Sequence, residues 1–463
     1  MKSNSYSVTN LTHLDGRNSQ KLLVLKDYFS EFAWMKYRLD IMAKWLKWLD
    51  CLKILKVNKS NLSGIIDKFD EKDAEEIREI EKTTNHDLKA IEYYLRDKLK
   101  TVGEENAAGL INLGLGSEDI NNIALRLIVS DSWQKVFLPE IVKLSRKLLD
   151  TTDHHKALTM LARTHGKPAS VTTFGKEIGL YMIRVINETE RINALQFSGK
   201  LAGEVGNYNA LQFILPKVDW LDVSEKFISS FGLVPNLFAT QINPYDDLII
   251  FFDAVKRLNN ILAGFSKDIW LYSLLDYVKI VKKEEEVGSA GMPHKVNPIY
   301  FEGAEGGLEQ ASGELEFYSR KLSYSRLQRD FSDSTVRRNL ASILGLCLLS
   351  YQSLNEGCRR LDVNTDKIKE DLDKHYEVVS EGLQNYIRLK GEVEGYEKIK
   401  KELRGVTLNK VEFNKLISKI GLSEKIKMIS LDDYQGLSVK ITELILKEAK
   451  KKLDEILPRY SVR

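Results

Sequence analysis

The stretch from Gly288 to Pro298, GSAGMPHKVNP, gathers several reactive side chains in one short segment. It carries the hydroxyl of Ser289, the ammonium of Lys295 and the amide of Asn297. Its glycines and prolines disfavour regular helix, so the sequence predicts a loop. A hydroxyl that can serve as a nucleophile or base, beside a cation, suits an active site. The alternative is a surface turn between two helices, and spacing alone leaves both interpretations open.

Two further polar segments could contribute to such a site. The segment 163–168, RTHGKP, places His165 in a break between helices, and loops on rigid scaffolds often carry function. The alternative is a core histidine whose hydrogen bonds are satisfied. The segment 83–87, TTNHD, aligns five hydrogen-bonding side chains around His86. Its alternative is an N-cap for a helix that runs on through Tyr94.

Two segments are suited to binding an anion. The segment 116–122, GSEDINN, reads as a helix start, where anionic groups bind, although capping alone also explains it. Between residues 326 and 338, hydroxyl side chains lie among guanidinium groups, a composition that suits phosphate or carboxylate. The arginines of this segment are Arg326, Arg329, Arg337 and Arg338.

Several familiar catalytic signatures are absent from the sequence. It has no HExxH, no zinc-spaced cysteine or histidine cluster, no Walker A loop and no GxSxG. The Gly114–Gly116 fragment lacks the third glycine of a dinucleotide fingerprint and follows no predicted strand. We therefore expect neither metal nor nicotinamide chemistry.

The composition is that of an ordinary soluble protein. The net charge of +3 on 463 residues predicts no general attraction to nucleic acid or membrane. Three cysteines without CxxC spacing predict reduced core thiols rather than a disulfide framework. The sequence has no apolar stretch of signal-peptide length at its start and no run of ~18 apolar residues, so we expect a cytoplasmic protein.

The strongest periodicity predicts one long helix over 247–280, with apolar residues at steps of three and four. At 1.5 Å per residue it would be about 50 Å long and would need antiparallel neighbours. Such neighbours are predicted over 121–149, 174–195 and 334–354. With only eight prolines in the chain, we predict an all-α fold of three helical domains. Their predicted bounds are 1–110, 111–365 and 366–463, the second being a long-helix bundle that carries the catalytic motifs.

With these motifs in order, the chain resembles the fumarase/aspartase superfamily, and within it the bacterial adenylosuccinate lyases. The loop at 288–298 fits the superfamily pattern GSSxMPxKxN except at Ala290. The resemblance covers nearly the whole chain. Its motifs are DGR, TTNHD, SEDINN, RTHG, GEVGNYNA, TQI, the loop and QRDFSDSTVRRN.

The resemblance implies a β-elimination that releases fumarate without a cofactor. The expected substrates are adenylosuccinate, which gives AMP, and the succinylated imidazole carboxamide ribotide (SAICAR), which gives AICAR. Ser289 matches the family's general base and His165 its general acid. Lys295 and Asn297 would stabilise the charge that develops on the carboxylate. His86 would orient the substrate or tune His165.

The resemblance also implies a set of substrate contacts and a homotetramer whose sites each draw on three chains. The expected contacts are Arg17, Asn18, Asn85, His86, Asp87, Gly116, Ser117, Thr164, Gln241, Lys295, Asn297, Arg329, Ser334 and Arg338. The central bundle would assemble with the other subunits.

The chain departs from the family pattern at several positions outside the expected catalytic set. These are Asn18, Asn112, Gly116, Lys167, Tyr245, Ala290 and Gly303. Each lost hydrogen bond costs ~0.5–1.5 kcal/mol, so together they predict weaker binding or a changed substrate preference. Two alternatives follow. One is a lyase for another succinylated amine or for aspartate. The other is a weak or inactive paralogue that serves as a nucleotide-binding or structural oligomer.

Overall fold

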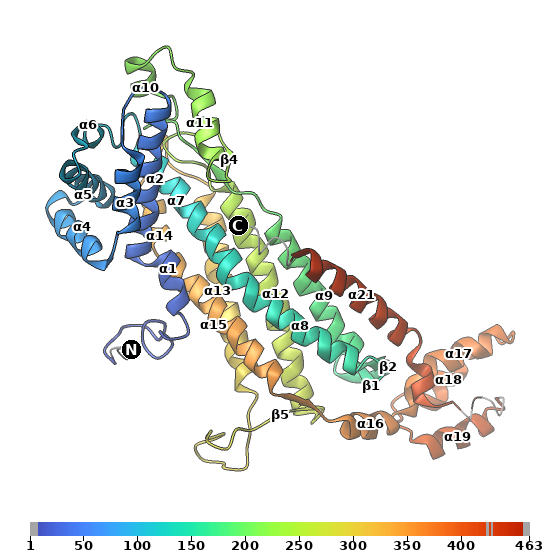
Figure 1. Cartoon of the computed structure of the whole chain (residues 1–463). Coiled ribbons are helices and arrows are strands. Elements are labelled where there is room, and N and C mark those ends of the chain that lie inside the picture. Colours follow the sequence, from blue (N-terminus) through green and yellow to red (C-terminus); the bar gives the residue numbers. More distant parts are fainter. Residues whose placement is uncertain (1–7, 423–425, 427–428, 457–463) are drawn as a thin grey trace. The chain divides into compact units, whose positions relative to one another are not determined.

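The computed structural model describes residues 8–422, 426 and 429–456, and these are mainly helical (Figure 1). The chain forms two compact units. Unit 1 comprises Met1–Pro139, Arg191–Asn259 and Gly307–Leu349, and unit 2 comprises Glu140–Glu190, Asn260–Gly306 and Ser350–Arg463. The unit boundaries fall within long helices, so these helices contribute residues to both units. The three domains expected from the sequence remain a prediction.

Most helices of unit 1 lie entirely within that unit. They are α1 (Lys26–Phe29), α2 (Glu31–Cys51), α3 (Lys59–Asp67), α4 (Glu71–Thr84), α5 (Asp87–Thr101), α6 (Glu105–Ala108), α7 (Ser117–Ser132), α10 (Asn209–Ile214), α11 (Trp220–Ser229) and α14 (Ser332–Arg337). Strands β3 (Ser198–Gly199) and β4 (Val234–Pro235) pair in parallel. The helices that continue into unit 2 are α8 (Leu138–His154), α9 (Phe174–Asn193), α12 (Asp246–Leu274), α13 (Ile299–Leu322) and α15 (Leu340–Arg359).

Helix α2 lies at the centre of the N-terminal part of unit 1. Ser30 caps it by accepting a hydrogen bond from the backbone N–H of Ala33. Trp45 is fully buried, with its ring centroid 5.4 Å from that of Phe227 and 6.5 Å from that of Trp220, both on α11. This aromatic contact joins α2 to α11. Helices α4 and α5 also contact α2 (Figure 1).

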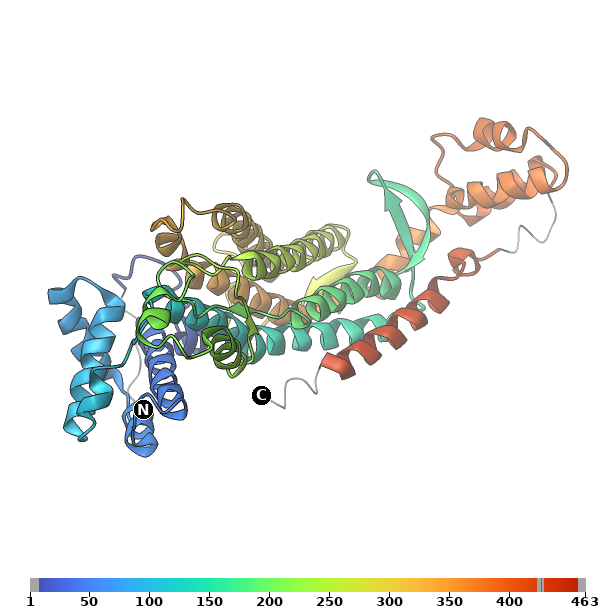
Figure 2. The same ribbon diagram turned by 90° about the horizontal axis from the view of Figure 1, so that it is seen from above.

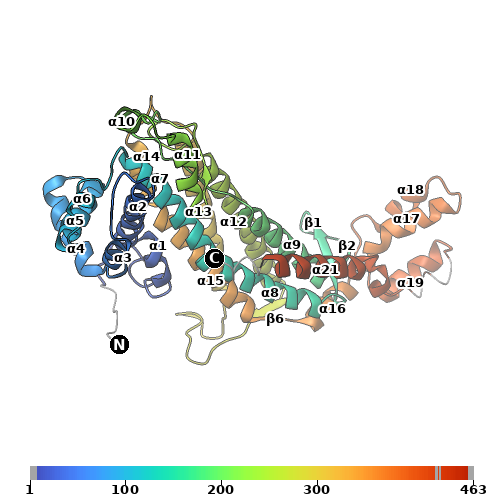
Figure 3. The same ribbon diagram turned by 45° about the horizontal axis from the view of Figure 1, so that its top comes forward.

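Unit 2 combines parts of the long helices with short strands and a C-terminal group of helices. The helices are α16 (Thr365–Asp373), α17 (Ser380–Leu389), α18 (Gly395–Leu403), α19 (Lys410–Lys419) and α21 (Ser438–Ile456). The antiparallel strand pairs are β1 (Thr159–Thr164) with β2 (Lys167–Thr173) and β5 (Val278–Ile280) with β6 (Leu361–Val363). Helix α21 packs along α9, where Lys452 pairs with Glu190 at 2.5 Å (Figure 3).

The β1–β2 hairpin connects the end of α8 to the start of α9 (Figure 2). Its Leu161 and Val171 belong to the same buried cluster as Tyr376 and Phe413, from the C-terminal part of unit 2. The hairpin therefore rests on an apolar base, while its turn carries polar residues.

The predicted all-α class is confirmed, with two corrections to the predicted helix bounds. The helix expected over 247–280 ends at Leu274. Asp276 adopts a left-handed φ of 57°, and the Tyr277 N–H returns to the Tyr272 carbonyl, which closes the helix end. The segment Val278–Ile280 is a strand instead.

The second correction concerns the helix expected over 334–354, which is divided into α14 and α15. The helices expected over 121–149 and 174–195 are confirmed by α7–α8, joined through a π-helical turn at Trp133–Phe137, and by α9. No described helix is both long and apolar enough to cross a membrane.

Candidate active site

The TTNHD segment forms the junction between α4 and α5 in unit 1. Asn85 ends α4 in the left-handed conformation, with φ 48°, and His86 is the N-cap of α5. The His86 Nδ1 accepts a hydrogen bond from the Lys89 N–H at 3.3 Å, so this ring nitrogen caps the start of α5. The capping interpretation is therefore confirmed. It does not remove the functional one, because 54% of the His86 side chain stays exposed.

Asp87 begins α5 and faces two arginines. Its Oδ2 lies 3.0 Å from Arg38 Nη1 and 3.9 Å from Arg338 Nη2. Burial raises the pKa of Asp87, but the Arg38 guanidinium, the Leu88 N–H and Arg338 together outweigh burial and lower that pKa. Asp87 is thus an anionic acceptor held beside Arg338, whose side chain is 66% exposed.

The GSEDINN segment starts α7 with Gly116 as N-cap. The Asp119 Oδ2 accepts a hydrogen bond from the Gly116 N–H at 2.8 Å, and Asp119 Oδ1 lies 3.0 Å from the fully buried Lys200 Nζ. The backbone N–H groups of Ala202 and Gly203 also donate to Asp119. This side chain therefore fixes the helix start to the GEVGNYNA segment, and Ser117 beside it is half-buried.

Glu118, the next residue of α7, lies at the centre of a buried charged cluster. Only 1% of it is exposed, and it binds Arg337 through two contacts of 3.0 and 3.1 Å. Arg329 Nη2 lies 3.1 Å from Glu118 Oε1. The two arginines overcome burial and hold the pKa of Glu118 at about 2, so the carboxylate stays ionised. Arg337, which the sequence offered as an anion ligand, is thus engaged within the protein.

Arg329 is the better placed of these two arginines for a ligand. Its Nε is buried and has no hydrogen-bond partner among the described residues, whereas its Nη1 donates to Gln241 Oε1 at 3.4 Å. Gln241 Nε2 in turn donates to Glu204 Oε2 at 2.7 Å. Asp333 Oδ1 lies 3.7 Å from Arg329 Nη2. Its Oδ2 accepts a hydrogen bond from the Tyr245 hydroxyl at 2.6 Å.

The other unit 1 candidates are placed as follows. Ser334 is buried on α14, within the arginine-rich segment. Asn18 Nδ2 lies 2.9 Å from His13 Nδ1, in the N-terminal segment. Arg17 is exposed, and none of the contacts found in the described residues joins its side chain to the other candidates.

In unit 2, His165 lies at the turn of the β1–β2 hairpin. Thr164 pairs with Lys167, and His165 and Gly166 have φ of 54° and 74°, as a two-residue hairpin turn with left-handed residues requires. The turn is exposed. At its base, Arg163 Nη2 lies 2.7 Å from Asp371 Oδ2, which anchors the hairpin to α16.

The loop at 281–298, between β5 and α13, carries the other unit 2 candidates. A Cβ on Gly288 would lie 2.5 Å from the Lys295 carbonyl oxygen, so glycine lets the two ends of this loop approach. Ser289 is half-buried, and its Oγ accepts a hydrogen bond from the Met292 N–H at 3.2 Å. Lys295 is exposed and Asn297 half-buried. Among the described residues, no hydrogen bond or ion pair joins this loop to the His165 turn.

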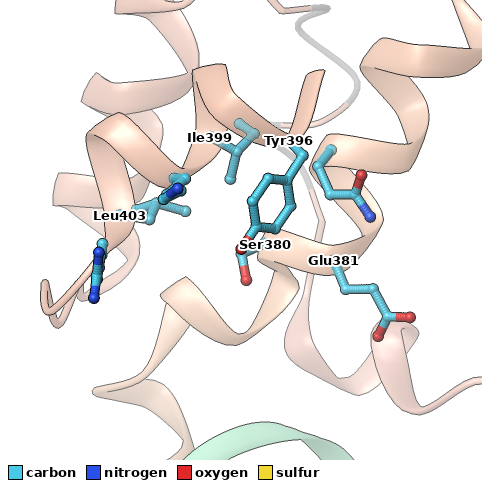
Figure 4. A pocket seen from close by; sticks show the side chains of 8 residues that line it. Ser380, Glu381, Tyr396, Ile399 and Leu403 are labelled. Carbon is cyan, nitrogen blue, oxygen red and sulfur yellow. The ribbon is translucent and has the colours of Figure 1, made fainter. Parts of the chain in front are cut away.

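Unit 2 also contains a cavity among its C-terminal helices. It has a volume of about 630 Å³ and is formed by α17 and α18, with Tyr396 and Glu381 among its lining residues (Figure 4). None of the predicted site residues lines it. The candidate site is therefore defined by its polar side chains rather than by this cavity.

Comparison with known families matches most of the chain. Residues 44–313 match the lyase family model, and residues 325–434 match the adenylosuccinate lyase C-terminal model. The first range holds His165 and the loop with Ser289, whereas the second holds Arg329, Ser334 and Arg338.

Curated relatives agree over almost the full length. Adenylosuccinate lyase of Haemophilus influenzae is 39% identical over 449 residues, covering 94% of this chain and 98% of the relative. Adenylosuccinate lyase of Escherichia coli K12 is 36% identical with the same coverage. The chain belongs to the adenylosuccinate lyase family. It is therefore an enzyme of the lyase class.

Solved structures outside this family share the fold. A 3-carboxy-cis,cis-muconate lactonizing enzyme from Pseudomonas putida superimposes with a TM-score of 0.76 at 16% identity, over 93% of this chain and 97% of that one. A fumarate lyase from Mesorhizobium sp. BNC1 gives 0.74 at 16% identity, over 92% and 97%. At this identity the likeness concerns the fold alone.

Sequence reasoning missed several polar groups that organise unit 1. Glu118 and Glu204 lay inside recognised motifs without being assigned a role, and Asp333 was overlooked between two serines. Two adjacent carboxylates at a helix start were a usable signal for Glu118. Nothing local in the sequence pointed to the Tyr245–Asp333 hydrogen bond.

Proposed function

We propose that this lyase eliminates fumarate from adenylosuccinate, giving AMP, and from SAICAR, giving AICAR. The observation that carries the proposal is the gathering of distant segments in unit 1. Arg338 lies beside Asp87, and Arg329 bridges Glu118 and Gln241. These contacts join four motif segments into one polar site with cations suited to a phosphate.

The nucleotide would bind through the unit 1 residues. Donors for phosphate oxygens would be the exposed guanidinium of Arg338 and the Nε of Arg329, which no described side chain or carbonyl pairs with. Ser334 lies on the helix between them and would contact phosphate or ribose. Asp87 offers an ionised acceptor for a hydroxyl or amino group of the nucleotide, next to Asn85 and His86. The remaining proposed contacts of this part are Arg17, Asn18, Gly116, Ser117 and Gln241.

The reaction needs a base that removes a proton from the carbon next to a substrate carboxylate. We assign this role to Ser289, whose hydroxyl requires activation by nearby cations. The electron pair of the broken C–H bond forms the double bond of fumarate as the C–N bond breaks. Lys295 and Asn297 would stabilise the negative charge that builds up on the carboxylate.

The departing nitrogen takes its electron pair from the C–N bond and needs a proton. His165 would supply that proton, because a histidine can donate one near neutral pH. Its place at the tip of an anchored hairpin gives it a defined position with an exposed ring. Thr164, beside it in the turn, is a proposed substrate contact.

We further propose a homotetramer in which each site combines residues from different subunits. Support comes from large apolar side chains exposed on α12, such as Ile250 and Trp270, which a neighbouring helix bundle would cover. If Ser289 and His165 of one site come from different subunits, two inactive variants can complement each other.

The roles of Ser289 and His165 are tested by Ser289→Ala and His165→Ala. Each should lower turnover of adenylosuccinate at least ~100-fold without loss of folded protein. Ser323→Ala and His154→Ala serve as matched controls at exposed positions and should retain wild-type turnover. Retention of turnover in either active-site variant would refute that residue's role.

The shared site is tested by mixing the two inactive variants after partial denaturation and refolding. Reassembled mixtures should regain activity, because some sites then contain an intact serine and an intact histidine. Light scattering should give four times the monomer mass of 53.0 kDa. Mixtures that stay inactive although mixed oligomers form would contradict sites shared in this way.

A further inference from the structure

Gly116 and Glu204, from two motifs separated by 88 positions in the sequence, occupy the same small space in unit 1. A Cβ built on Gly116 would lie 3.0 Å from the Glu204 carboxyl carbon and 3.1 Å from each carboxylate oxygen. The backbone of Gly116 has φ −87° and ψ 163°, which any residue can adopt. Backbone conformation therefore does not demand a glycine here, whereas a side chain at 116 would push the Glu204 carboxylate aside by a few tenths of an ångström.

Gly116 is the N-cap of α7, a position where glycine is accepted almost as well as threonine. Serine and threonine are preferred at N-caps because their hydroxyl accepts a backbone N–H, a role that glycine cannot fill. Asp119, the N3 residue, accepts a hydrogen bond from the Gly116 N–H, which is the half of a capping box that needs no side chain at 116. The absence of a side chain at 116 leaves the space in which the Glu204 carboxylate lies.

The Glu204 carboxylate has a specific partner in this position. It accepts a hydrogen bond from Gln241 Nε2 at 2.7 Å, while Gln241 Oε1 accepts from Arg329 Nη1 at 3.4 Å. An ionised carboxylate can only accept and a guanidinium can only donate. Glu204 and Arg329 therefore fix the orientation of the Gln241 amide, with its nitrogen towards Glu204 and its oxygen towards Arg329. The amide nitrogen also keeps a second N–H for an acceptor on a ligand.

We propose that Glu204 is a positioning residue for substrate binding, and that it acts by fixing the side-chain amide of Gln241. The role depends on glycine at 116, because a larger residue would displace the carboxylate from Gln241. Gln241 then presents an N–H to an acidic substrate group, such as a carboxylate of the succinyl moiety. Arg329 keeps its ion pair with Glu118. This inference rests on the proposed function.

Three variants measured by steady-state kinetics with adenylosuccinate test the proposal. Glu204→Ala should raise KM about 3- to 10-fold, the effect of one lost hydrogen bond, and leave kcat within about twofold. Glu204→Gln keeps an acceptor for Gln241 and should restore KM to within about twofold of wild type. Glu225→Ala removes an exposed carboxylate of α11 in the same unit and should change neither constant.

The dependence on Gly116 is tested by a double-mutant cycle. Serine caps helices well, so Gly116→Ser displaces Glu204 without weakening the start of α7. It should raise KM by a factor similar to that of Glu204→Ala. The double variant should show no further increase, because both changes remove the same contact. Multiplied effects of about 10- to 100-fold would show that the two positions act independently and would overturn the proposal.

Other outcomes also decide the matter. If Glu204→Ala and Glu204→Gln both lower KM, the carboxylate acts by repelling the anionic substrate, and the positioning role is wrong. An unchanged KM in Glu204→Ala would likewise overturn it. Failure of the proposed function is distinguishable, since the wild-type protein would then release no fumarate from adenylosuccinate.

Discussion

The most informative perturbation of the buried charged cluster is Glu118→Gln, which preserves shape and removes one negative charge. The variant leaves Arg337 and Arg329 without their shared carboxylate. The site is closed to water, since only 1% of Glu118 and 8% of Arg337 are exposed. Breaking a buried ion pair from one side is strongly destabilising, because the remaining charge stays buried and unpaired. We therefore expect a large loss of stability from replacing one carboxylate oxygen by an amide nitrogen.

The magnitude follows from the carboxylate itself. The pKa of Glu118 lies at about 2 in the folded protein, against an ordinary value of 4.5. One pKa unit corresponds to ~1.4 kcal/mol, so ionisation of Glu118 stabilises the fold by about 3 kcal/mol. For compact units of this size, the loss would lower Tm by roughly 6–12 °C.

The pH dependence has a defined sign. Because folding lowers the pKa of Glu118, its contribution is fully present well above pH 4.5 and is lost as the pH falls towards 2. The difference in unfolding free energy between wild type and Glu118→Gln should be constant between about pH 6 and 8. It should shrink by about a quarter at pH 4 and by more than half at pH 3.

The assay is unfolding followed by circular dichroism at fixed protein concentration, since assembly makes Tm depend on concentration. Glu370→Gln is the matched control, because Glu370 is an exposed residue that pairs with Lys367 and Lys374 on the surface of α16. This control should leave Tm unchanged within error. A Tm loss below about 2 °C for Glu118→Gln, or a stability gap that does not narrow with acid, would refute the reasoning.

Two further predictions concern the hairpin and the glycines. Asp371→Asn should weaken the anchor of Arg163 and lower kcat about 10-fold while the circular dichroism spectrum is unchanged; a wild-type kcat would show that the anchor does not position His165. Gly206→Ala should lower Tm by several degrees, because its Cβ would lie 2.1 Å from the Ala239 carbonyl oxygen at a φ of 84°. In Gly303→Ala, on α13, the new Cβ would meet no described atom within 4 Å, so this variant should instead raise Tm slightly. Equal effects at both glycines would contradict the steric argument.

The sequence predicted the helical class and most of the long helices because their apolar residues repeat locally. It misjudged the end of α12, since Val278–Ile280 continues the apolar pattern. That segment pairs with Leu361–Val363, a partner more than 80 residues away. Local periodicity cannot distinguish a last helical turn from a strand whose partner is so distant.

The candidate site shows the same division between local and distant information. The turn at His165 and the loop at Ser289 were predictable because glycine and proline mark breaks in helices. The pairing of Glu118 with Arg337 joins residues 219 positions apart, and only the fold reveals it. In the sequence, Gly116 is only a departure from the family pattern that loses a side chain. The structure adds that the Glu204 carboxylate occupies the space beside it.

The central claim is tested most directly by incubating the purified wild-type protein with adenylosuccinate and measuring fumarate and AMP together. The account predicts that both products form in equal amounts, at rates that fall at least ~100-fold in Ser289→Ala, and that SAICAR gives fumarate and AICAR in the same way. Absence of fumarate from the folded wild-type protein with either nucleotide would contradict it. Binding of AMP without turnover would then identify a family member that no longer catalyses the reaction.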